Sequence, residues 1–123
     1  MKDHTFDPRL DTNLLLDLYD DDREYALVAF SDFLKLTPVL MGELEKELST
    51  GTVESFRQKV HKLKPTFSYV GLPGMTRQAE GIEKKCREAA GTDELRRLYE
   101  DLKTDFEKNY ELIQGEAAKL STM

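Results

Sequence analysis

The stretch VHKLKPTFSYVG, residues 60–71, decides the interpretation of this sequence because it combines helical spacing with residues that are unusual inside a helix. Its apolar residues recur at three- and four-residue steps, which is the period of an amphipathic helix. It also holds His61, one of only two histidines in the chain, and Pro65 four residues later. Proline there removes the N–H that would bond to the carbonyl of His61 and bends the helix. The apolar spacing continues in phase through the proline, so we predict one bent helix rather than two.

Breaks in the apolar pattern divide the whole chain into one short helix and four long ones. The short helix is expected over about residues 11–19. An acidic cluster at 20–22 caps the first long helix, which bends at Pro38 and ends at the STGT break of 49–52. We expect the other long helices from about Thr52 to Gly71, from about Pro73 to Ala89, and from the N-cap Thr92 to about Lys119.

Four long helices with short connections predict an all-α fold: an antiparallel up-down-up-down four-helix bundle with a short N-terminal capping helix. We expect residues 1–123 to form a single domain, with residues 1–10 as an N-terminal arm. In chain order, the expected inner faces are Leu14, Leu15 and Leu18; Tyr25, Val28, Ala29, Phe33, Leu36, Leu40, Leu44 and Leu48; Val53, Phe56, Val60, Leu63, Phe67 and Val70; Met75, Ala79, Ile82, Cys86 and Ala89; and Leu95, Leu98, Leu102 and Phe106 with Tyr110 or Ile113.

Composition excludes several classes of function and partner. A formal charge of −6 argues against a general nucleic-acid binder, which needs a basic face. No apolar run approaches the roughly 18 residues of a membrane span, and the first ten residues contain no secretory signal. The single cysteine, Cys86, lies on an apolar stripe and is interpreted as core filler. We therefore expect a cytoplasmic monomer that binds neither nucleic acid nor membrane.

A helical wheel places His61 on the solvent side of its helix, about 130° from the centre of the apolar stripe. Lys64 and Ser68 lie along one edge of this exposed face, and Pro65 and Tyr69 flank the histidine on the other. A lone histidine in such a position is usually an ordinary surface residue. The position alone therefore assigns no function.

The charge around His61 favours binding of an anionic group. From Arg57 to Lys64 there are four basic residues and no acidic one, although the protein as a whole is acidic. We expect a local positive patch that attracts an anion or an acidic partner surface to the exposed imidazole. On charge alone, a solvated basic face is the better explanation of the run.

Taken together, these residues resemble the histidine-containing phosphotransfer (HPt) domains of two-component phosphorelays. Members of that family carry leucine and lysine two and three residues after the histidine, a small residue, usually glycine, at four, a glycine at ten, and an acidic or amide residue near twenty-two. The resemblance extends over nearly the whole chain, because the family fold is also a short helix packed on four antiparallel helices. The matching residues here are His61, Leu63, Lys64, Pro65, Gly71 and Glu83, with Pro65 standing where the family usually has glycine.

The resemblance implies a stoichiometric phosphoryl carrier rather than an enzyme. His61 would accept the group from a receiver-domain phospho-aspartate and pass it to another receiver, with a hybrid histidine kinase as the further partner. Lys64 would offer positive charge to the phosphoryl oxygens, and Glu83 would orient the imidazole. Arg57, Pro65, Ser68 and Tyr69 are the candidate partner-binding residues. We expect no cofactor and no metal here, since the Mg²⁺ that aspartate chemistry needs belongs to the receiver.

Other functions fit these residues less well, and one remains open. An ATP-dependent kinase lacks its glycine-rich phosphate-binding motifs, and a di-metal bundle lacks Glu-x-x-His pairs. His4 lies in the N-terminal arm, away from such a site. The open alternative is a helical interaction module that binds partners without phosphorylation, a degenerate phosphotransfer scaffold. Pro65 keeps this alternative open because it changes the shape of the helix beside His61.

Overall fold

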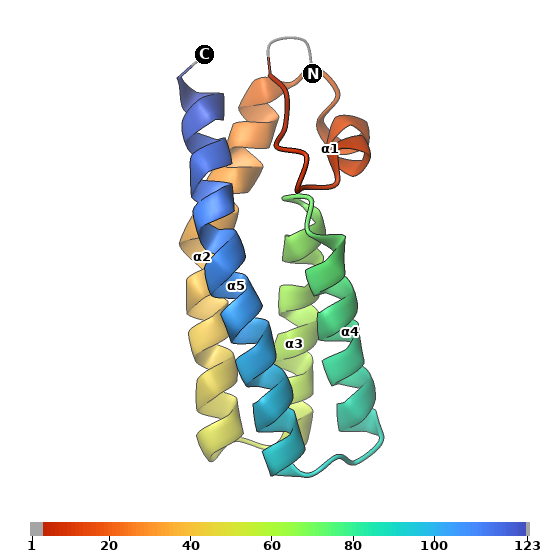
Figure 1. The fold of residues 1–123 in the computed structure, drawn as a ribbon. Helices are drawn as coiled ribbons and strands as arrows, with labels where there is room; N and C mark the ends of the chain where they lie inside the picture. The colour runs from red at the N-terminus through yellow and green to blue at the C-terminus, as the bar shows by residue number, and fades with distance from the viewer. Residues whose placement is uncertain (1–3, 123) are drawn as a thin grey trace.

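The computed structural model describes residues 4–122, and every regular element within them is a helix (Figure 1). The all-helical prediction is therefore confirmed over this range, as are the number and order of the helices. The helices are α1 (Thr12–Tyr19), α2 (Arg23–Thr50), α3 (Val53–Ser68), α4 (Pro73–Arg87) and α5 (Thr92–Ser121).

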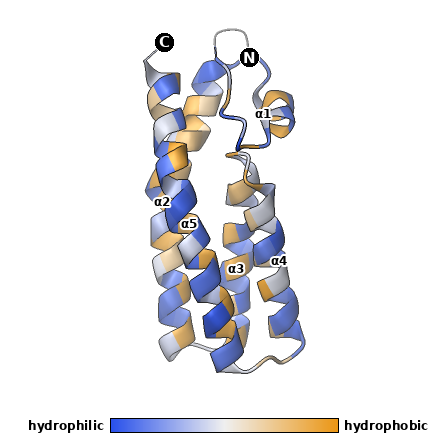
Figure 2. Cartoon of the chain, in the orientation of Figure 1, coloured by the Kyte–Doolittle hydropathy of each residue, from blue (hydrophilic) through white to orange (hydrophobic). Residues whose placement is uncertain are grey.

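The four long helices surround a common apolar core. Helix α3 packs against α2 and α4, and α5 packs against the same two helices. The α2–α3 and α4–α5 connections lie at one end of the molecule, and the α3–α4 turn lies partway along it, beneath α1 (Figure 1). Figure 2 shows hydrophobic and hydrophilic residues sharing each long helix, as expected for helices with one buried face. The short helix α1 lies at the end where α3 turns into α4 (Figure 1).

Local sequence signals explain where α3 begins and ends. The Thr52 hydroxyl accepts a bond from the Ser55 N–H, and the Ser55 hydroxyl accepts one from the Thr52 N–H, which is a reciprocal capping box. The helix then runs without a break through Pro65 to Ser68. Gly71 follows with a φ of 78°, a left-handed conformation that favours glycine.

Gly71 is also required by close packing with the N-terminal segment. Its carbonyl accepts a bond from the Asp11 N–H at 2.9 Å. A Cβ at this position would lie 2.9 Å from Cδ1 of Leu15 and 3.1 Å from Cβ of Leu10. The arm and α1 therefore cover the α3–α4 turn, and only a residue without a side chain allows this approach.

The two helical prolines leave different backbone carbonyls without their usual donors. Pro38 has no N–H to offer the Leu34 carbonyl, and the Tyr110 hydroxyl of α5 donates to that carbonyl instead at 2.8 Å. Pro65 likewise has no N–H to offer the carbonyl of His61. The first carbonyl lies between packed helices, whereas the second lies on the exposed face of α3.

The buried face of α2 differs from the prediction. Tyr25, Val28 and Leu36 were expected inside, but each is more than half exposed. The apolar residues of α2 occupy two faces of the helix, so local spacing alone does not identify the face that meets α3 and α5. The residues that α2 does bury are Ala26, Phe30, Phe33, Thr37, Met41 and Leu44.

Smaller corrections apply at the ends of other helices. In α1 the inward residues are Leu15 and Tyr19, while Leu18 is exposed. Ala89 lies beyond α4 in a left-handed conformation, since that helix ends at Arg87. The N-cap of α5 is Gly91 rather than Thr92, which is the first helical residue.

Helix α2 is long and apolar enough, by length and composition alone, to cross a membrane. Its best 18-residue window has a mean hydropathy of 1.2. Asp32 and Lys35 interrupt the apolar residues of this helix, so it contains no uninterrupted apolar run of that length. Its length and mean hydropathy are weak evidence for a span, because a helix buried in a protein core passes the same test. Phe30 and Phe33 of α2 lie in the apolar core of the bundle.

Candidate functional site

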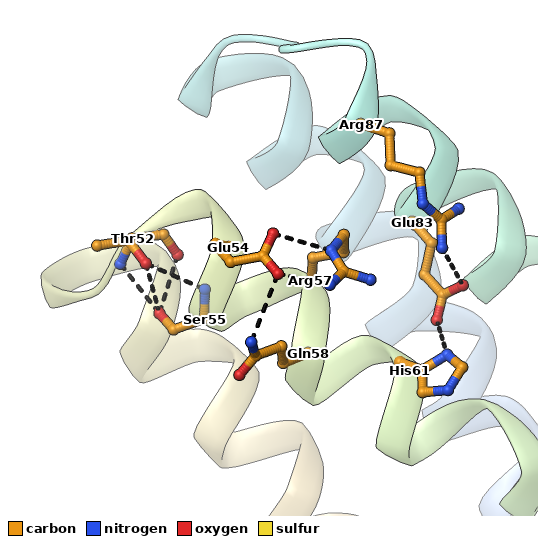
Figure 3. Close-up of polar contacts among 8 residues, drawn as sticks. All are labelled: Thr52, Glu54, Ser55, Arg57, Gln58, His61, Glu83 and Arg87. Carbon is orange, nitrogen blue, oxygen red and sulfur yellow. Dashed lines mark hydrogen bonds and ion pairs between the residues drawn. The ribbon is translucent and has the colours of Figure 1, made fainter.

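The candidate site is built from α3 and α4, which pack side by side. His61 projects from α3 with its side chain 65% exposed, as the helical wheel predicted. Glu83 projects from α4 and is buried, so a surface position for this glutamate is excluded. The Nδ1 atom of His61 lies 2.9 Å from Oε1 of Glu83 (Figure 3). This contact directs the far nitrogen, Nε2, away from Glu83 and toward solvent.

The second carboxylate oxygen of Glu83 faces two cations. Lys64 Nζ donates to Oε2 at 3.2 Å, and Arg87 Nη2 lies 3.8 Å from the same oxygen. Lys64 is one turn beyond the histidine on α3, and Arg87 is one turn beyond Glu83 on α4. The sequence analysis did not identify Arg87, although its spacing of four residues from Glu83 was a usable signal.

Two of the four basic residues in the run at 57–64 on α3 face acidic side chains other than Glu83. The Arg57 Nε donates to Glu54 at 3.0 Å, and this hydrogen bond raises the pKa of the arginine (Figure 3). Lys59 Nζ lies 3.5 Å from a carboxylate oxygen of Glu43. These acidic neighbours come from the preceding turn and from α2, so the run of sequence did not show them. Lys64 of this run and Arg87 of α4 both place positive charge at Glu83, beside His61.

The other candidate partner-binding residues are only partly accessible. Pro65 and Tyr69 are exposed. Ser68 is half-buried, and its hydroxyl lies 2.9 Å from the Thr76 hydroxyl of α4. The geometry therefore places Pro65 and Tyr69 on the same accessible face of α3 as His61, whereas Ser68 contributes to α3–α4 packing. Whether any of them binds a partner stays a prediction.

A groove of about 310 Å³ separates α2 from the end of α3. The exposed apolar residues of α2 line one side, including Tyr25, Val28 and Leu36, and Tyr69 lines the other. Within the described part of the chain, the buried Thr37 hydroxyl in this groove has no hydrogen-bond partner. The sequence analysis missed this surface because it assigned these α2 residues to the core.

Tyr19, which also lines this groove, holds the end of α3 in place. Its hydroxyl donates to the Tyr69 carbonyl at 2.5 Å, and burial raises its pKa to about 12. The phenol thus stays protonated and able to donate at neutral pH. This bond ties α1 to the face of α3 that carries His61.

The remaining reactive side chains have structural environments. Cys86 is buried, as expected, and burial raises the pKa of its thiol, which reduces its reactivity. His4 is buried against α5, with Nε2 2.9 Å from Oε2 of Glu116. Across residues 4–122, no three His, Cys, Asp or Glu side chains cluster closely enough to hold a metal ion.

Comparison with known families agrees with this geometry. A family model described as the Hpt domain matches residues 28–115, which is more than half of the chain. The chain therefore belongs to the Hpt domain family. The matched segment contains α3 and α4 entirely, and with them His61, Lys64, Glu83 and Arg87. A search of curated proteins and a search of solved structures find no match to this chain.

Membership gives the protein a phosphotransfer role in two-component signalling. Hpt domains are phosphocarriers rather than enzymes, and they interact with receiver domains and kinases in phosphorelays.

Proposed function

We propose that this protein is a phosphorelay intermediate that accepts a phosphoryl group on Nε2 of His61 and passes it on. The donor is the phospho-aspartate of one receiver domain, and the acceptor is the aspartate of another. The observation that carries this assignment is the exposed imidazole whose Nδ1 is held by a buried carboxylate. Few surface histidines have this arrangement, because an exposed side chain ordinarily keeps its rotamer freedom.

The Glu83 contact prepares the ring for nucleophilic attack. When Nδ1 carries the proton and donates a hydrogen bond to Glu83, the lone pair of the neutral ring lies on Nε2. Attack forms the P–Nε2 bond while the P–O bond to the aspartyl carboxylate breaks, and that carboxylate leaves with the electron pair. The phosphorylated ring keeps its Nδ1 proton and gains positive charge, which the Glu83 carboxylate stabilises. Return of the group to a receiver reverses these steps.

The surroundings of His61 supply charge and a docking surface. Lys64 provides positive charge for the phosphoryl oxygens. We assign the groove between α2 and α3 to receiver binding, since its exposed apolar residues lie beside Tyr69. We retain Arg57 and Ser68 as rim residues of that contact. The proposed scaffold is an up-down-up-down bundle formed as a single domain by residues 1–123.

Several further properties belong to this proposal. The protein acts as a cytoplasmic monomer, and a hybrid histidine kinase is the source of the phosphoryl groups. It holds no cofactor of its own, and the Mg²⁺ needed for aspartate chemistry is bound by the receiver. It binds neither nucleic acid nor a membrane.

The test is transfer of labelled phosphate from a phosphorylated receiver domain to this protein. We expect acid-labile label on the wild-type chain and on His4→Gln, but none on His61→Gln. Circular dichroism should show that His61→Gln is folded, because the side chain is exposed. Label on both histidine variants would place the acceptor elsewhere and contradict the proposal.

The second candidate function is a partner-binding module that is never phosphorylated. The apolar groove between α2 and α3 favours it, because that surface could bind a receiver without any chemistry at His61. A folded wild-type chain that binds receivers but takes label from none of several would support this function instead.

A further inference from the structure

The Glu83 carboxylate has more cationic neighbours than its contact with His61 requires. Its side chain is 3% exposed, and its two oxygens have separate tasks. Oε1 faces the imidazole at 2.9 Å, whereas Oε2 faces Lys64 at 3.2 Å and Arg87 at 3.8 Å. A buried carboxylate needs such compensation, since an unpaired charge in the interior is strongly unfavourable.

Lys64 cannot bond to the Glu83 carboxylate and to a phosphoryl group on His61 equally well at the same time. In the structure its ammonium donates to Glu83, and its side chain is 22% exposed. Stabilising a phosphoryl group on Nε2, which points away from Glu83, requires Lys64 to turn outward and loosen that bond. The carboxylate would then lose its closest cation at the moment when the ring, carrying positive charge, depends on it.

Arg87 is placed to compensate for this loss. It lies one turn along α4 and approaches Oε2 of Glu83 from its own helix, as Figure 3 shows. Its side chain is 58% exposed, so it can shorten the 3.8 Å separation without repacking the core. Arg57, the other arginine nearby, is held by Glu54 and is less available (Figure 3).

We propose that Arg87 is a positioning residue that takes over Oε2 of Glu83 when Lys64 turns toward the phosphoryl group. Arg87 acts through Glu83 and keeps the carboxylate in place against Nδ1 of His61. This inference rests on the proposed function, in which Lys64 contacts the phosphoryl group. The bond between Arg87 and Glu83 forms as the one between Lys64 and Glu83 loosens, so one cation always compensates the buried charge.

The decisive experiment does not require phosphorylation. Lys64→Gln removes the closer cation and imitates a Lys64 that has left Glu83. In nuclear magnetic resonance spectra of this variant, the Arg87 guanidinium should rotate several-fold more slowly than in the wild type, because it now bonds to Oε2. An unchanged Arg87 signal would overturn the proposal.

A double-mutant cycle adds an energetic test. Lys64→Gln and Arg87→Gln together should raise the unfolding equilibrium constant by about tenfold more than the product of their single effects. Arg97→Gln removes the same charge from an exposed position on α5 and should show no such coupling to Lys64→Gln. Arg87→Lys should restore much of the lost stability. Purely multiplicative effects would contradict the proposal.

The outcome for Arg87 is separable from the outcome for phosphotransfer. If receivers fail to label the wild-type chain while both Arg87 results are as expected, Arg87 does compensate Glu83 when Lys64 is removed, but the phosphorelay function fails and with it the exchange driven by a phosphoryl group. If the chain is labelled on His61 but Arg87 behaves like Arg97, the function stands and the role of Arg87 is wrong. With a labelled chain, a faster loss of label from Arg87→Gln than from Arg97→Gln supports both.

Discussion

Two histidine–glutamate pairs in this protein have the same contact distance and opposite surroundings. His61 and His4 each place a ring nitrogen 2.9 Å from a glutamate oxygen. The His61 side chain is 65% exposed, whereas that of His4 is 3% exposed. Both glutamates are buried. The difference between the pairs therefore lies in the histidine and in which of its nitrogens is bonded.

The bonded nitrogen decides what remains available for chemistry. His61 uses Nδ1, the nitrogen near the backbone, and presents Nε2 to solvent. His4 bonds to Glu116 through Nε2 and packs edge-on against Phe6. Its outer nitrogen is therefore buried and already bonded. A His–Glu pair alone thus predicts no function. An exposed far nitrogen combined with a fixed near nitrogen is what makes His61 suited to carry a group.

The two glutamates also stabilise different parts of the molecule. Glu116 accepts from the Asp7 N–H at 3.1 Å as well as contacting His4, and it tethers the N-terminal arm to α5. Glu83 joins α3 to α4 through side chains that are themselves in contact with solvent. We infer that the first pair serves mainly stability and the second mainly chemistry.

The largest expected effect separates the two histidines by function. His61→Gln should eliminate acceptance of labelled phosphate and leave the unfolding transition nearly unchanged, because the replaced ring is exposed. His4→Gln should keep full labelling and lower the thermal midpoint. Parallel labelling and thermal denaturation of the two variants check this. If His61→Gln unfolded instead, His61 would be a structural residue and the comparison would fail.

The next largest effect separates the two glutamates by stability. Glu116→Ala should lower the free energy of unfolding by about 3 kcal/mol, since it leaves a buried histidine and a backbone N–H without their acceptor. Glu83→Ala should cost only about 1 kcal/mol, because water can solvate the partners that it leaves. Urea denaturation of both variants measures the difference. Equal losses would show that exposure of the partner does not matter here.

A third prediction compares the same glutamates by their effect on phosphoryl transfer. Glu83→Gln keeps an oxygen to accept the Nδ1 proton but removes the negative charge that stabilises a phosphorylated ring. The transfer rate should fall roughly tenfold. Glu116→Gln should leave it unchanged, since that residue lies in the other pair. Rapid-quench labelling from a phosphorylated receiver gives both rates, and equal rates for the two variants would contradict the assigned role of Glu83.

The smallest expected effect concerns the backbone beside the exposed histidine. Pro65→Ala returns an N–H to the His61 carbonyl, while Pro38→Ala returns one to a carbonyl that Tyr110 already satisfies. We expect Pro65→Ala to add less than about 1 kcal/mol, because the loss of proline rigidity in the unfolded chain offsets the new bond. The labelling rate should change by less than about threefold. A much faster rate would show that Pro65 obstructs the receiver.

Local sequence determined the elements and most of the buried faces correctly. The stripe of α3 was predicted accurately from Phe56 to Val70, because mostly polar and charged residues occupy the rest of that helix, whereas Val53 at its start is exposed rather than buried. The same reasoning placed His61 in solvent. In α2 it was wrong, since Tyr25, Val28 and Leu36 form a second apolar face that spacing cannot distinguish from the core face.

Only the tertiary structure decided which distant residues meet. Glu83 lies 22 residues from His61, and its role was expected only from the family resemblance. Its burial, and the approach of Arg87 to the oxygen shared with Lys64, depend on how α3 and α4 pack. The pair of His4 and Glu116 spans 112 residues and had no signal in the sequence. Helical periodicity is a local property that sets which way a side chain points, whereas the partner that it meets depends on the packing of whole helices.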